Sequence, residues 1–326
     1  MNRKLPAVLL SAAMAFVLAA CGSGSGGSGG SGGDDGKITL GFSQVGSESG
    51  WREANTKSIK ESAQTAGIDL KFSDAQQKQE NQIATIRSYI QQKVDVIAFS
   101  PVVVTGWDAV LKEAQAAKIP VVLTDRAVDS DPSLYVSFLG SDFVKEGEAI
   151  GDWTLNEYKD ATAPVNIVQL EGTVGSAPAI DRKKGFESKI ASNPNLKVIA
   201  SQSGDFTRAD GKEVMTAILK ANPKIDLLFA HNDDMGIGAI QAIEEAGKKP
   251  GVDIKIVTID AVHDGMQALA DGKINFIAEC SPLLGDQLMD IVKKIKAGQP
   301  VEKRIITEET TFTQQQASEA LPNRKY

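Results

Sequence analysis

The chain has 326 residues, of which 42% are hydrophobic and 24% charged, and its formal net charge is −7. These values are typical of a globular protein of about two domains. Because the balance is acidic and no block of lysine and arginine occurs, the composition disfavours a nucleic-acid partner.

The N-terminus has the pattern of a secretory leader over residues 1–20. A short basic start, "MNRK", precedes an apolar stretch from Leu5 to Ala20, which is shorter than the ~20 residues that a membrane-spanning helix needs. "LAAC", which ends at Cys21, follows and resembles the lipobox of bacterial lipoproteins, where the leader is cut before a cysteine that is then acylated. The alternative is an ordinary small-residue cleavage site beside a chance cysteine. We therefore expect an exported chain, anchored by a lipid at Cys21 on the outer side of the cytoplasmic membrane, at the cell surface or in the periplasm.

Residues 21–36 predict a lipidated cysteine followed by a flexible tether. All residues after Cys21 in this range are Gly, Ser or Asp, so they have nothing to bury and behave as coil with a mean span on the order of 20 Å. An engineered linker would have the same composition. The only other cysteine of the sequence, Cys280, has no disulfide partner within the exported body, and we expect it to be a small buried hydrophobe.

From Lys37 onward, short apolar runs alternate with amphipathic stretches. Apolar residues recur at helical spacing in three stretches, 83–90, 107–114 and 284–295. Runs that are apolar on both faces and alternate with helices favour parallel sheets covered on each side. The predicted strands are 38–43, 94–100, 119–125, 134–140, 165–172, 197–203, 226–232, 254–260 and 274–281.

The body repeats itself at low resolution, which predicts two similar α/β lobes, the second beginning near Asp142. Residues 95–125 and 226–260 each read as strand, helix, a turn preceded by "EA", strand and a terminal aspartate. In such sheets ligands bind outside the carboxyl ends of the strands, where loops and helix N-termini present unpaired backbone donors. Asp125 and Asp260 both fall at that edge.

Other polar and aromatic side chains follow the predicted strands at the same edge. Together with Asp125 and Asp260, they supply carboxylates that accept from hydroxyls, guanidinium groups that donate in a fork, and aromatic faces that cover the C–H side of a ring. This combination predicts a site for a sugar. The further residues are Ser49, Trp51, Arg52, Arg126, Asp181, Arg182, Asp205, Phe206, Arg208, Asn232 and Glu279.

Each of these residues also has an ordinary structural explanation. An aspartate at a strand end is often a helix cap, Arg182 could pair with Asp181 or Glu187, and Trp51 and Phe206 could pack beneath loops. The two-lobed interpretation nevertheless places all of them on one edge, and this convergence favours the binding site.

Several segments resemble a known family across nearly the whole chain from Ile38. They include "GFSQVGSESGWR", "QQKQENQI", "AIDRKKGF", "SQSGDFTR" and "AHNDDM". With these segments the chain resembles the sugar-binding receptors of bacterial ABC importers, in the group of the ribose-binding proteins and, within it, the galactofuranose-binding proteins. The resemblance implies two Rossmann-like parallel-sheet lobes joined by three crossovers, the type I periplasmic-binding-protein fold. It implies an N-terminal lobe of 37–140 and 281–308 and a C-terminal lobe of 141–280 and 309–326.

The resemblance also implies how the site is built. Asp125 and Arg126 would bind sugar hydroxyls from the first lobe. Arg182, Asn232 and Asp260 would answer from the second lobe, with Glu279 at a crossover. Trp51 and Phe206 would cover the two faces of the ring, and Ser49 and Arg52 complete the expected set, with Arg52 selecting the furanose.

The resemblance implies a monomeric binding protein that is not an enzyme, has no catalytic residue, cofactor or metal, and delivers a monosaccharide to an ABC permease by hinge closure. One departure from the family pattern is "DAVHDG" after the strand that ends at Asp260, which leaves His263 without an expected role.

Three other functions were weighed against this one. A retaining glycosidase needs two carboxyls ~5 to 5.5 Å apart, which Asp125 and Asp260 could supply, but no nucleophile elbow, Walker loop or metal cluster is apparent. "HNDD" at 231–234 could hold a metal, although its acids are better helix caps. A DNA-binding regulator of similar architecture would carry a helix-turn-helix where this chain has its leader. A third alternative is a sugar receptor that hands its closed form to a membrane sensor, and the sequence does not separate this function from transport.

Overall fold

The computed structural model describes residues 36–326. The predicted leader, the lipidation at Cys21 and the tether before Gly36 lie outside the described residues. Residues Lys37–Tyr326 form one unit. None of the helices in this part of the chain combines the length and the apolar character that crossing a membrane requires.

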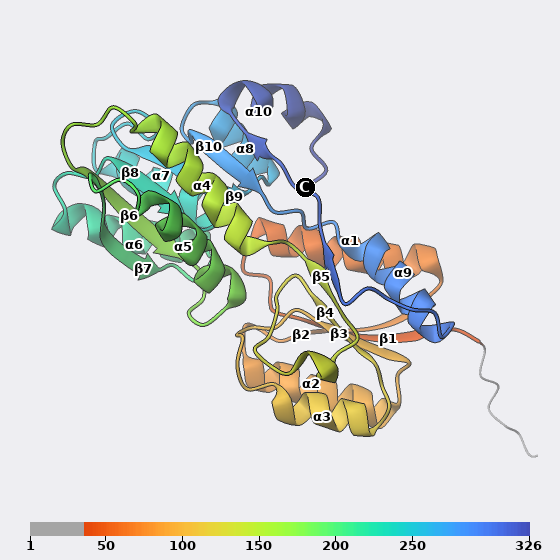
Figure 1. Cartoon of the computed structure of the whole chain (residues 1–326). Coiled ribbons are helices and arrows are strands. Elements are labelled where there is room, and N and C mark those ends of the chain that lie inside the picture. Colours follow the sequence, from red (N-terminus) through yellow and green to blue (C-terminus); the bar gives the residue numbers. More distant parts are fainter. Residues whose placement is uncertain (1–35) are drawn as a thin grey trace, which may run out of the picture. The chain divides into compact units, whose positions relative to one another are not determined.

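Two six-stranded sheets organise the unit, as Figure 1 shows. All neighbouring strands in them are parallel except β12, which is antiparallel to β10. The first sheet has the order β11 (Arg304–Ile306), β5 (Ser137–Gly140), β4 (Val121–Thr124), β3 (Val96–Phe99), β1 (Thr39–Gln44) and β2 (Asp69–Asp74). The second has the order β12 (Thr311–Phe312), β10 (Phe276–Glu279), β9 (Lys255–Asp260), β8 (Leu227–Ala230), β6 (Val165–Glu171) and β7 (Leu196–Ser203).

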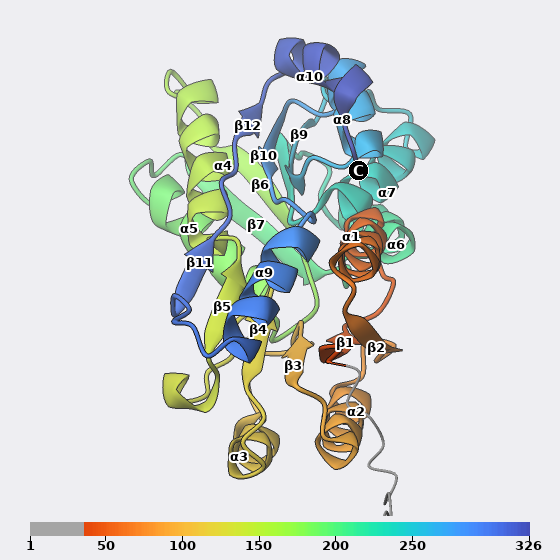
Figure 2. The same cartoon turned by 90° about the vertical axis from the view of Figure 1, so that its right-hand side faces the viewer.

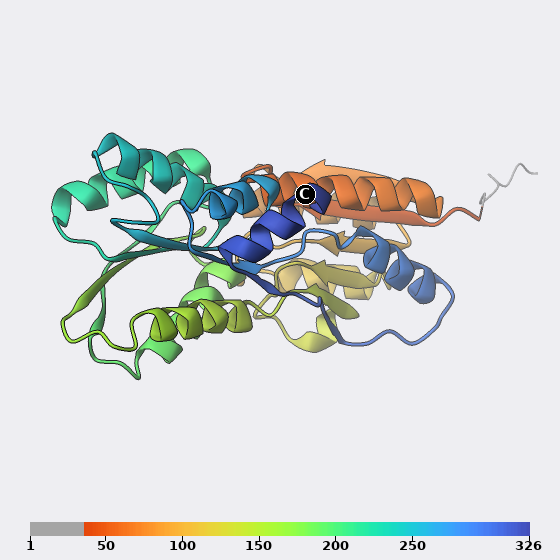
Figure 3. The same ribbon diagram turned by 90° about the horizontal axis from the view of Figure 1, so that it is seen from above.

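Helices cover both faces of each sheet. The first sheet has α1 (Gly50–Ala66) and α9 (Gly285–Lys296) on one face, and α2 (Gln79–Gln92) and α3 (Asp108–Ala116) on the other. The second has α4 (Phe143–Glu157) and α5 (Ala177–Ile190) on one face, and α6 (Arg208–Ala221), α7 (Asp233–Glu245), α8 (His263–Ala270) and α10 (Gln314–Ala320) on the other. Figure 3 shows the green α4 and α5 and the teal α6 and α7 on opposite sides of their sheet. Short 3₁₀ turns cover Pro132–Leu134 and Leu321–Asn323.

The apolar runs form strands because both of their faces are buried. Along β3, Val96 and Ala98 join the core beneath α1 and α9, whereas Ile97 and Phe99 join the core beneath α2 and α3. Successive side chains of a strand point to opposite faces, so a continuous apolar run supplies two cores at once. The same alternation occurs in β8, where Leu227 and Leu228 belong to different clusters.

The chain passes between the two sheets three times. It does so after β5 at residues 141–142, after β10 at 280–284, and between β11 and β12 at 307–310. Figure 2 shows the third passage as the dark blue segment that runs from β11 up to β12. These passages divide the unit into two lobes, each a Rossmann-like sheet with helices on both faces.

All nine predicted strands are present, and the three predicted helical stretches fall in α2, α3 and α9. Three strands were not predicted: β2, β11 and β12. β2 is an edge strand whose residues are half-buried or exposed, so its sequence, "DLKFSD", lacks a continuous apolar run. β11 and β12 have only three and two residues, too few to show a period.

Candidate ligand-binding site

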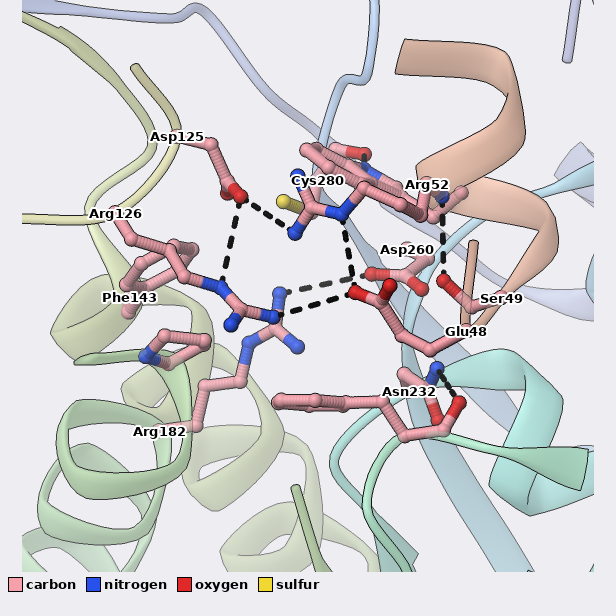
Figure 4. A pocket seen from close by; sticks show the side chains of 13 residues that line it. Glu48, Ser49, Arg52, Asp125, Arg126, Phe143, Arg182, Asn232, Asp260 and Cys280 are labelled. Atoms are coloured by element: carbon pink, nitrogen blue, oxygen red, sulfur yellow. Dashed lines mark hydrogen bonds and ion pairs between the residues drawn. The ribbon is translucent and has the colours of Figure 1, made fainter. Parts of the chain in front are cut away.

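A pocket with about 290 Å³ of empty space, part of it open to solvent, lies between the two lobes at the carboxyl ends of the strands (Figure 4). Residues of both lobes line it. They are Glu48, Ser49, Trp51, Arg52, Asp125, Arg126, Phe143, Pro178, Arg182, Phe206, Asn232, Asp260 and Cys280. Nine of the ten residues predicted from the sequence are in this set, and Glu279 is the one that is not.

Asp125 and Arg126 directly follow the end of β4. The Asp125 backbone donates to Leu139 O at 2.7 Å, and its carboxylate Oδ2 accepts from Arg52 Nη2, also at 2.7 Å. Arg126 Nε lies 3.6 Å from the same Oδ2, beyond hydrogen-bond distance, and has no partner among the described residues although it is buried. Burial together with the charge of Arg52 lowers the pKa of Arg126 to about 10. The guanidinium therefore faces the cavity with an unused donor.

Glu48 is the centre of the charge network of the first lobe. Its Oε1 accepts from Arg52 Nε at 3.0 Å and lies 3.6 Å from Arg126 Nη2, and its side chain is 2% exposed. Burial acts to raise the pKa of Glu48, but the charges of Arg52 and Arg126 outweigh it, so the pKa is lowered and the carboxylate is ionised. The second oxygen, Oε2, is buried and accepts no hydrogen bond from the described residues. Glu48 thus adds an unused acceptor to the unused donor of Arg126.

Arg52 holds these acids in place from behind. Besides Glu48 and Asp125, it donates from Nη1 to Gln44 Oε1 at 3.1 Å, and its guanidinium lies over the Trp51 ring at 4.6 Å. The residue is 2% exposed. Three of its nitrogens therefore bind protein acceptors, and its main effect on the cavity is to orient two carboxylates.

In the second lobe, Arg182 has a similar position. Its Nε donates to Glu146 Oε2 at 2.7 Å, its Nη1 donates to the carbonyl oxygen of His231, and its Nη2 lies 3.6 Å from Asp260 Oδ1. Burial raises the pKa of Asp260 well above its ordinary value, and the charge of Arg182 acts against this shift. Asp260 therefore combines acceptor capacity with a preference for keeping a proton.

Two aromatic side chains complete the lining. The Trp51 indole, on α1, donates from Nε1 to Cys280 O at 2.7 Å, across to the second crossover. Phe206 is 4% exposed and lies beneath Arg126 and Arg182, whose guanidinium carbons are 5.3 and 6.0 Å from its ring centre. Gly172 makes room for this ring, because a Cβ atom at Gly172 would come within 1.8 Å of it.

The backbone is strained at three lining residues. Asp125, Phe206 and Asp260 have φ values of 62°, 63° and 125°, a region that residues other than glycine rarely adopt. Asp125 and Asp260 are the equivalent strand-terminal residues of the two repeats found in the sequence. Such strain costs about 1–3 kcal/mol per residue and concentrates at functional sites.

Two lining residues also cap helices, as the ordinary explanation of such residues predicts. Ser49 Oγ accepts from Arg52 N at the start of α1, and Asn232 Oδ1 accepts from Met235 N at the start of α7. Asn232 also donates to Phe206 O and so fixes the loop that carries the aromatic ring. In "HNDD" the cap is therefore the asparagine, which corrects the expectation that the acids cap the helix.

The two acids of "HNDD" bind elsewhere. Asp233 accepts from Thr258 Oγ1 and Val262 N and ties α7 to the loop after β9. Asp234 accepts from Gly50 N at 2.8 Å and from Arg208, so it connects the second lobe to the start of α1 in the first.

Glu279 does not reach the cavity. It is the last residue of β10, and its Oε1 accepts from Arg324 Nη1 and Tyr326 Oη, both at 2.8 Å, while Oε2 accepts from Thr310 N. Because side chains alternate along a strand, its neighbour Cys280 faces the cavity instead. Cys280 is 1% exposed, as expected for a small buried hydrophobe.

Four other residues lie outside the lining. Arg208 is engaged by Asp234 and Asp264, and Asp205 is exposed. Asp181 is half-buried on α5. The His263 imidazole is 59% exposed at the start of α8, beside Asp264.

Four lining residues were missed by sequence reasoning: Glu48, Phe143, Pro178 and Cys280. Glu48 follows the end of β1 and stands four residues before Arg52, a spacing that could have indicated an ion pair. The other three carry no polar signal that separates them from ordinary core residues.

One group in the described part of the chain is close enough to hold a metal ion. Ligand atoms of Glu146, Cys280 and Glu309 all lie within 4.8 Å of one another. However, Glu146 already binds Arg182, and Glu309 Oε1 accepts from Ser141 Oγ, Thr307 Oγ1 and Ser281 N. The Arg182 guanidinium supplies the positive charge that a cation would bring, so we assign no metal to this group.

The lining holds acids and bases in equal number and has unused hydrogen-bonding capacity. Three arginines, Arg52, Arg126 and Arg182, face three acidic side chains, Glu48, Asp125 and Asp260. A ligand without net charge can satisfy such a site if it both donates and accepts hydrogen bonds. The fold and the site therefore define a two-lobed solute-binding protein with its cavity between the lobes.

Comparisons with known proteins agree with this class. Residues 40–300 match the model of the periplasmic binding protein domain. The galactofuranose-binding protein YtfQ of Escherichia coli is 50% identical over 293 residues, which cover 88% of this chain and 92% of that protein. The chain belongs to the periplasmic binding protein family, and its fold is the type I fold of that family.

Two solved structures are also similar to this chain. One, from Mycobacterium smegmatis in complex with β-D-fucofuranose, is 64% identical, has a TM-score of 0.88 and aligns over 89% of this chain and 95% of that one. The other is the binding protein of an arabinose ABC transporter from Shewanella, bound to L-arabinofuranose, with 49% identity, a TM-score of 0.85 and coverage of 88% and 96%. YtfQ is named as a binding protein and the Shewanella protein as the binding component of a transporter, and this chain, of the same family, is a binding protein and not an enzyme. The comparisons confirm the resemblance that the sequence indicated. Members of this family are located outside the cytoplasm.

Proposed function

We propose that this protein captures a monosaccharide in its furanose form between its two lobes and delivers it to an ABC permease. The observation that carries the proposal is the pair of buried groups without partners in the lining, Glu48 Oε2 and Arg126 Nε. A buried polar group without a partner costs about 1–3 kcal/mol, so a ligand whose hydroxyls donate to Glu48 and accept from Arg126 gains at both places. A sugar has several such hydroxyls.

The remaining lining residues fit the same ligand. Asp125 and Asp260 accept from hydroxyls, Arg182 donates, and Trp51 and Phe206 offer apolar faces. We add Glu48 to the predicted ligand-binding residues and leave Glu279 out, because Glu279 binds the C-terminal segment. Ser49, Arg52 and Asn232 belong to the site as residues that orient the first set.

The furanose preference is supported by the relatives, whose names and ligands are galactofuranose, fucofuranose and arabinofuranose. Sugar contacts from both lobes would stabilise the closed arrangement, which is a hinge closure about the three crossovers.

We further propose that the protein is a monomer tethered to the membrane by a lipid on Cys21. Replacing Cys21 by Ser should release it from the membrane fraction, and unchanged membrane association would contradict the lipid anchor.

Isothermal titration calorimetry with galactofuranose, L-arabinose, D-ribose and methyl galactopyranoside tests the proposal. One site is expected, with micromolar or tighter affinity for the sugars that supply a furanose ring and no measurable heat with the locked pyranoside. Preference for the pyranoside would contradict the furanose assignment, and absence of heat with every sugar would contradict the function.

A further inference from the structure

Glu146 lies behind the sugar-binding residues, on α4, and does not belong to the cavity lining. Its Oε2 accepts from Arg182 Nε at 2.7 Å, and the two side chains are 3% and 4% exposed. A second bond, from Arg182 Nη1 to His231 O, fixes the other side of the guanidinium. Arg182 is thus held in one plane by two protein acceptors, and its remaining edge faces the cavity (Figure 4).

Glycines bring the backbones of α4 and α5 close enough for this contact. A Cβ atom on Gly147 would lie 2.1 Å from Arg182 O, and one on Gly185 would lie 2.1 Å from Val144 O. The helices touch directly at these two positions, one of which follows Glu146. Any residue larger than glycine would separate the carboxylate from the guanidinium.

The Glu146 carboxylate also lies near the segments that join the lobes. One of its oxygens is within 4.8 Å of Cys280 Sγ, in the second crossover, and of a carboxylate oxygen of Glu309, in the third. Its Oε1 is buried and has no hydrogen-bond partner among the described residues. Glu309 in turn accepts from Ser141 of the first crossover and from Thr307 of its own. Glu146 therefore contacts Arg182 on one side and the segments that join the lobes on the other.

We propose that Glu146 is a positioning residue of the sugar site, which orients Arg182 from behind and links its orientation to the crossovers. The inference rests on the proposed function, because it names the residue that makes one of the sugar donors effective. This role explains why the carboxyl group of Glu146 is buried beside Arg182 although it does not line the cavity.

The charged groups around Glu146 indicate whether its ionised or its neutral side chain positions Arg182. Arg182 from α5 favours the ionised form, whereas Glu309 from the third crossover and Asp260 at the end of β9 disfavour it, as does burial. Cys280, after β10, stays a thiol because burial raises its pKa well above its ordinary value. Asp142, the half-buried N-cap of α4, and the exposed Lys145 line a second hollow together with Glu146. Burial raises the pKa of Glu146 to about 8, so at neutral pH the neutral acid accepts from Arg182 with one oxygen. A glutamine can do the same, but an alkyl side chain cannot.

Calorimetry with L-arabinose on the full chain and its variants tests the proposal. E146L removes the acceptor and should weaken binding by on the order of ten-fold to a hundred-fold. E146Q should recover most of that loss. T154A is the matched control, because Thr154 is buried on the same helix and its hydroxyl donates to Ile150 O, so the affinity of T154A should equal that of the wild type.

A double-mutant cycle with R182A separates positioning from a general effect on the fold. If Glu146 acts through Arg182, the losses of E146L and R182A should be far from additive in the double variant. Additive losses, or equal weakening in E146L, E146Q and T154A, would overturn the proposal. Failure of the wild type to bind any furanose would instead contradict the proposed function, so the two failures are distinguishable. Circular dichroism and melting of each sugar-free variant check that it is folded.

Discussion

At Asp125 the backbone has a φ of 62° and the carboxylate accepts from Arg52 at 2.7 Å. The residue therefore holds a strained strand end and also faces the cavity. Asp125 and Arg126 lie side by side after a buried strand, but their side chains form no hydrogen bond with each other, because the closest atoms of the ion pair are 3.6 Å apart. Both have capacity left for a ligand.

Replacing Asp125 by Asn tests this role without changing the backbone, since asparagine tolerates positive φ. D125N should weaken furanose binding by about 1.5–3 kcal/mol, because a charged acceptor becomes a neutral one. Calorimetry against D129N, an exposed aspartate four residues on, provides the comparison. Equal affinity of D125N and the wild type would exclude Asp125 from the site. Alanine is a poorer choice, because it would remove one of the three acceptors of Arg52 and strain the backbone, and so lower stability as well.

Glu146 makes a separate prediction about the pH dependence of stability. Its pKa is raised from the ordinary value of 4.5 to about 8 in the folded protein. The folded state therefore binds more protons than the unfolded state between these values, so the contribution of Glu146 to stability is full below pH 4.5 and is lost as the pH rises to 8. E146Q does not titrate, and its stability relative to the wild type should increase by up to ~1.4 kcal/mol per pH unit across that window. Urea unfolding of both proteins at pH 5.5, 7 and 8.5 measures this difference, and a constant difference would contradict a buried neutral Glu146.

Sequence reasoning could place most of the site residues but not their side-chain directions. Asp125, Arg182 and Asp260 were found because parallel strands end at a common edge. Glu279 was misplaced because one residue of shift at the end of β10 turns a side chain to the other face of the sheet, and the sequence does not show where the strand ends. Glu48 was missed because it lies in a polar loop after β1, where its burial depends on Arg52 and Arg126 and on no local pattern.

At the scale of elements, the strands with two buried faces were predictable and the edge strands were not. β3 and β8 are continuous apolar runs because each supplies two cores. β2, β11 and β12 pair at or near sheet edges, and the last two depend on a crossover that brings distant residues beside β5 and β10. Long-range pairing of this kind leaves no local signal.

The loop after β6 offers a prediction at this scale. A Cβ atom at Gly172 would lie 1.8 Å from the Phe206 ring, so G172A must displace the loop that carries this ring. We expect G172A to weaken furanose binding by roughly ten-fold, close to the effect of F206A, and to add little in the F206A background. Titration of the two single variants and the double variant measures this. Full additivity would mean that Gly172 acts on something other than Phe206.

At the scale of the whole unit, contacts between the lobes also lie outside the cavity. Asp234 of α7 accepts from Gly50 N at the first turn of α1, where the helix dipole favours a negative charge. Val104 N donates to Gly175 O at 2.9 Å, from the first lobe to the second. Under the proposed hinge closure these contacts would form only in the closed arrangement, so they would favour binding without touching the sugar.

Removing the Asp234 carboxylate should therefore weaken every sugar alike. We expect D234A to lower affinity about three-fold to ten-fold for L-arabinose and galactofuranose, with their ranking unchanged. D264A is the control, because Asp264 also binds Arg208 but is 57% exposed and lies on α8 of the second lobe. A change in the ranking of the sugars would show that Asp234 acts on the ligand itself.

The most direct test of the central claim is a crystal structure of the protein grown with L-arabinose. We predict one furanose ring between the lobes, with hydroxyls bound to Glu48, Asp125 and Arg126 on one side and to Arg182 and Asp260 on the other. A sugar bound to one lobe only, or bound elsewhere while these five side chains keep their present contacts, would contradict the account.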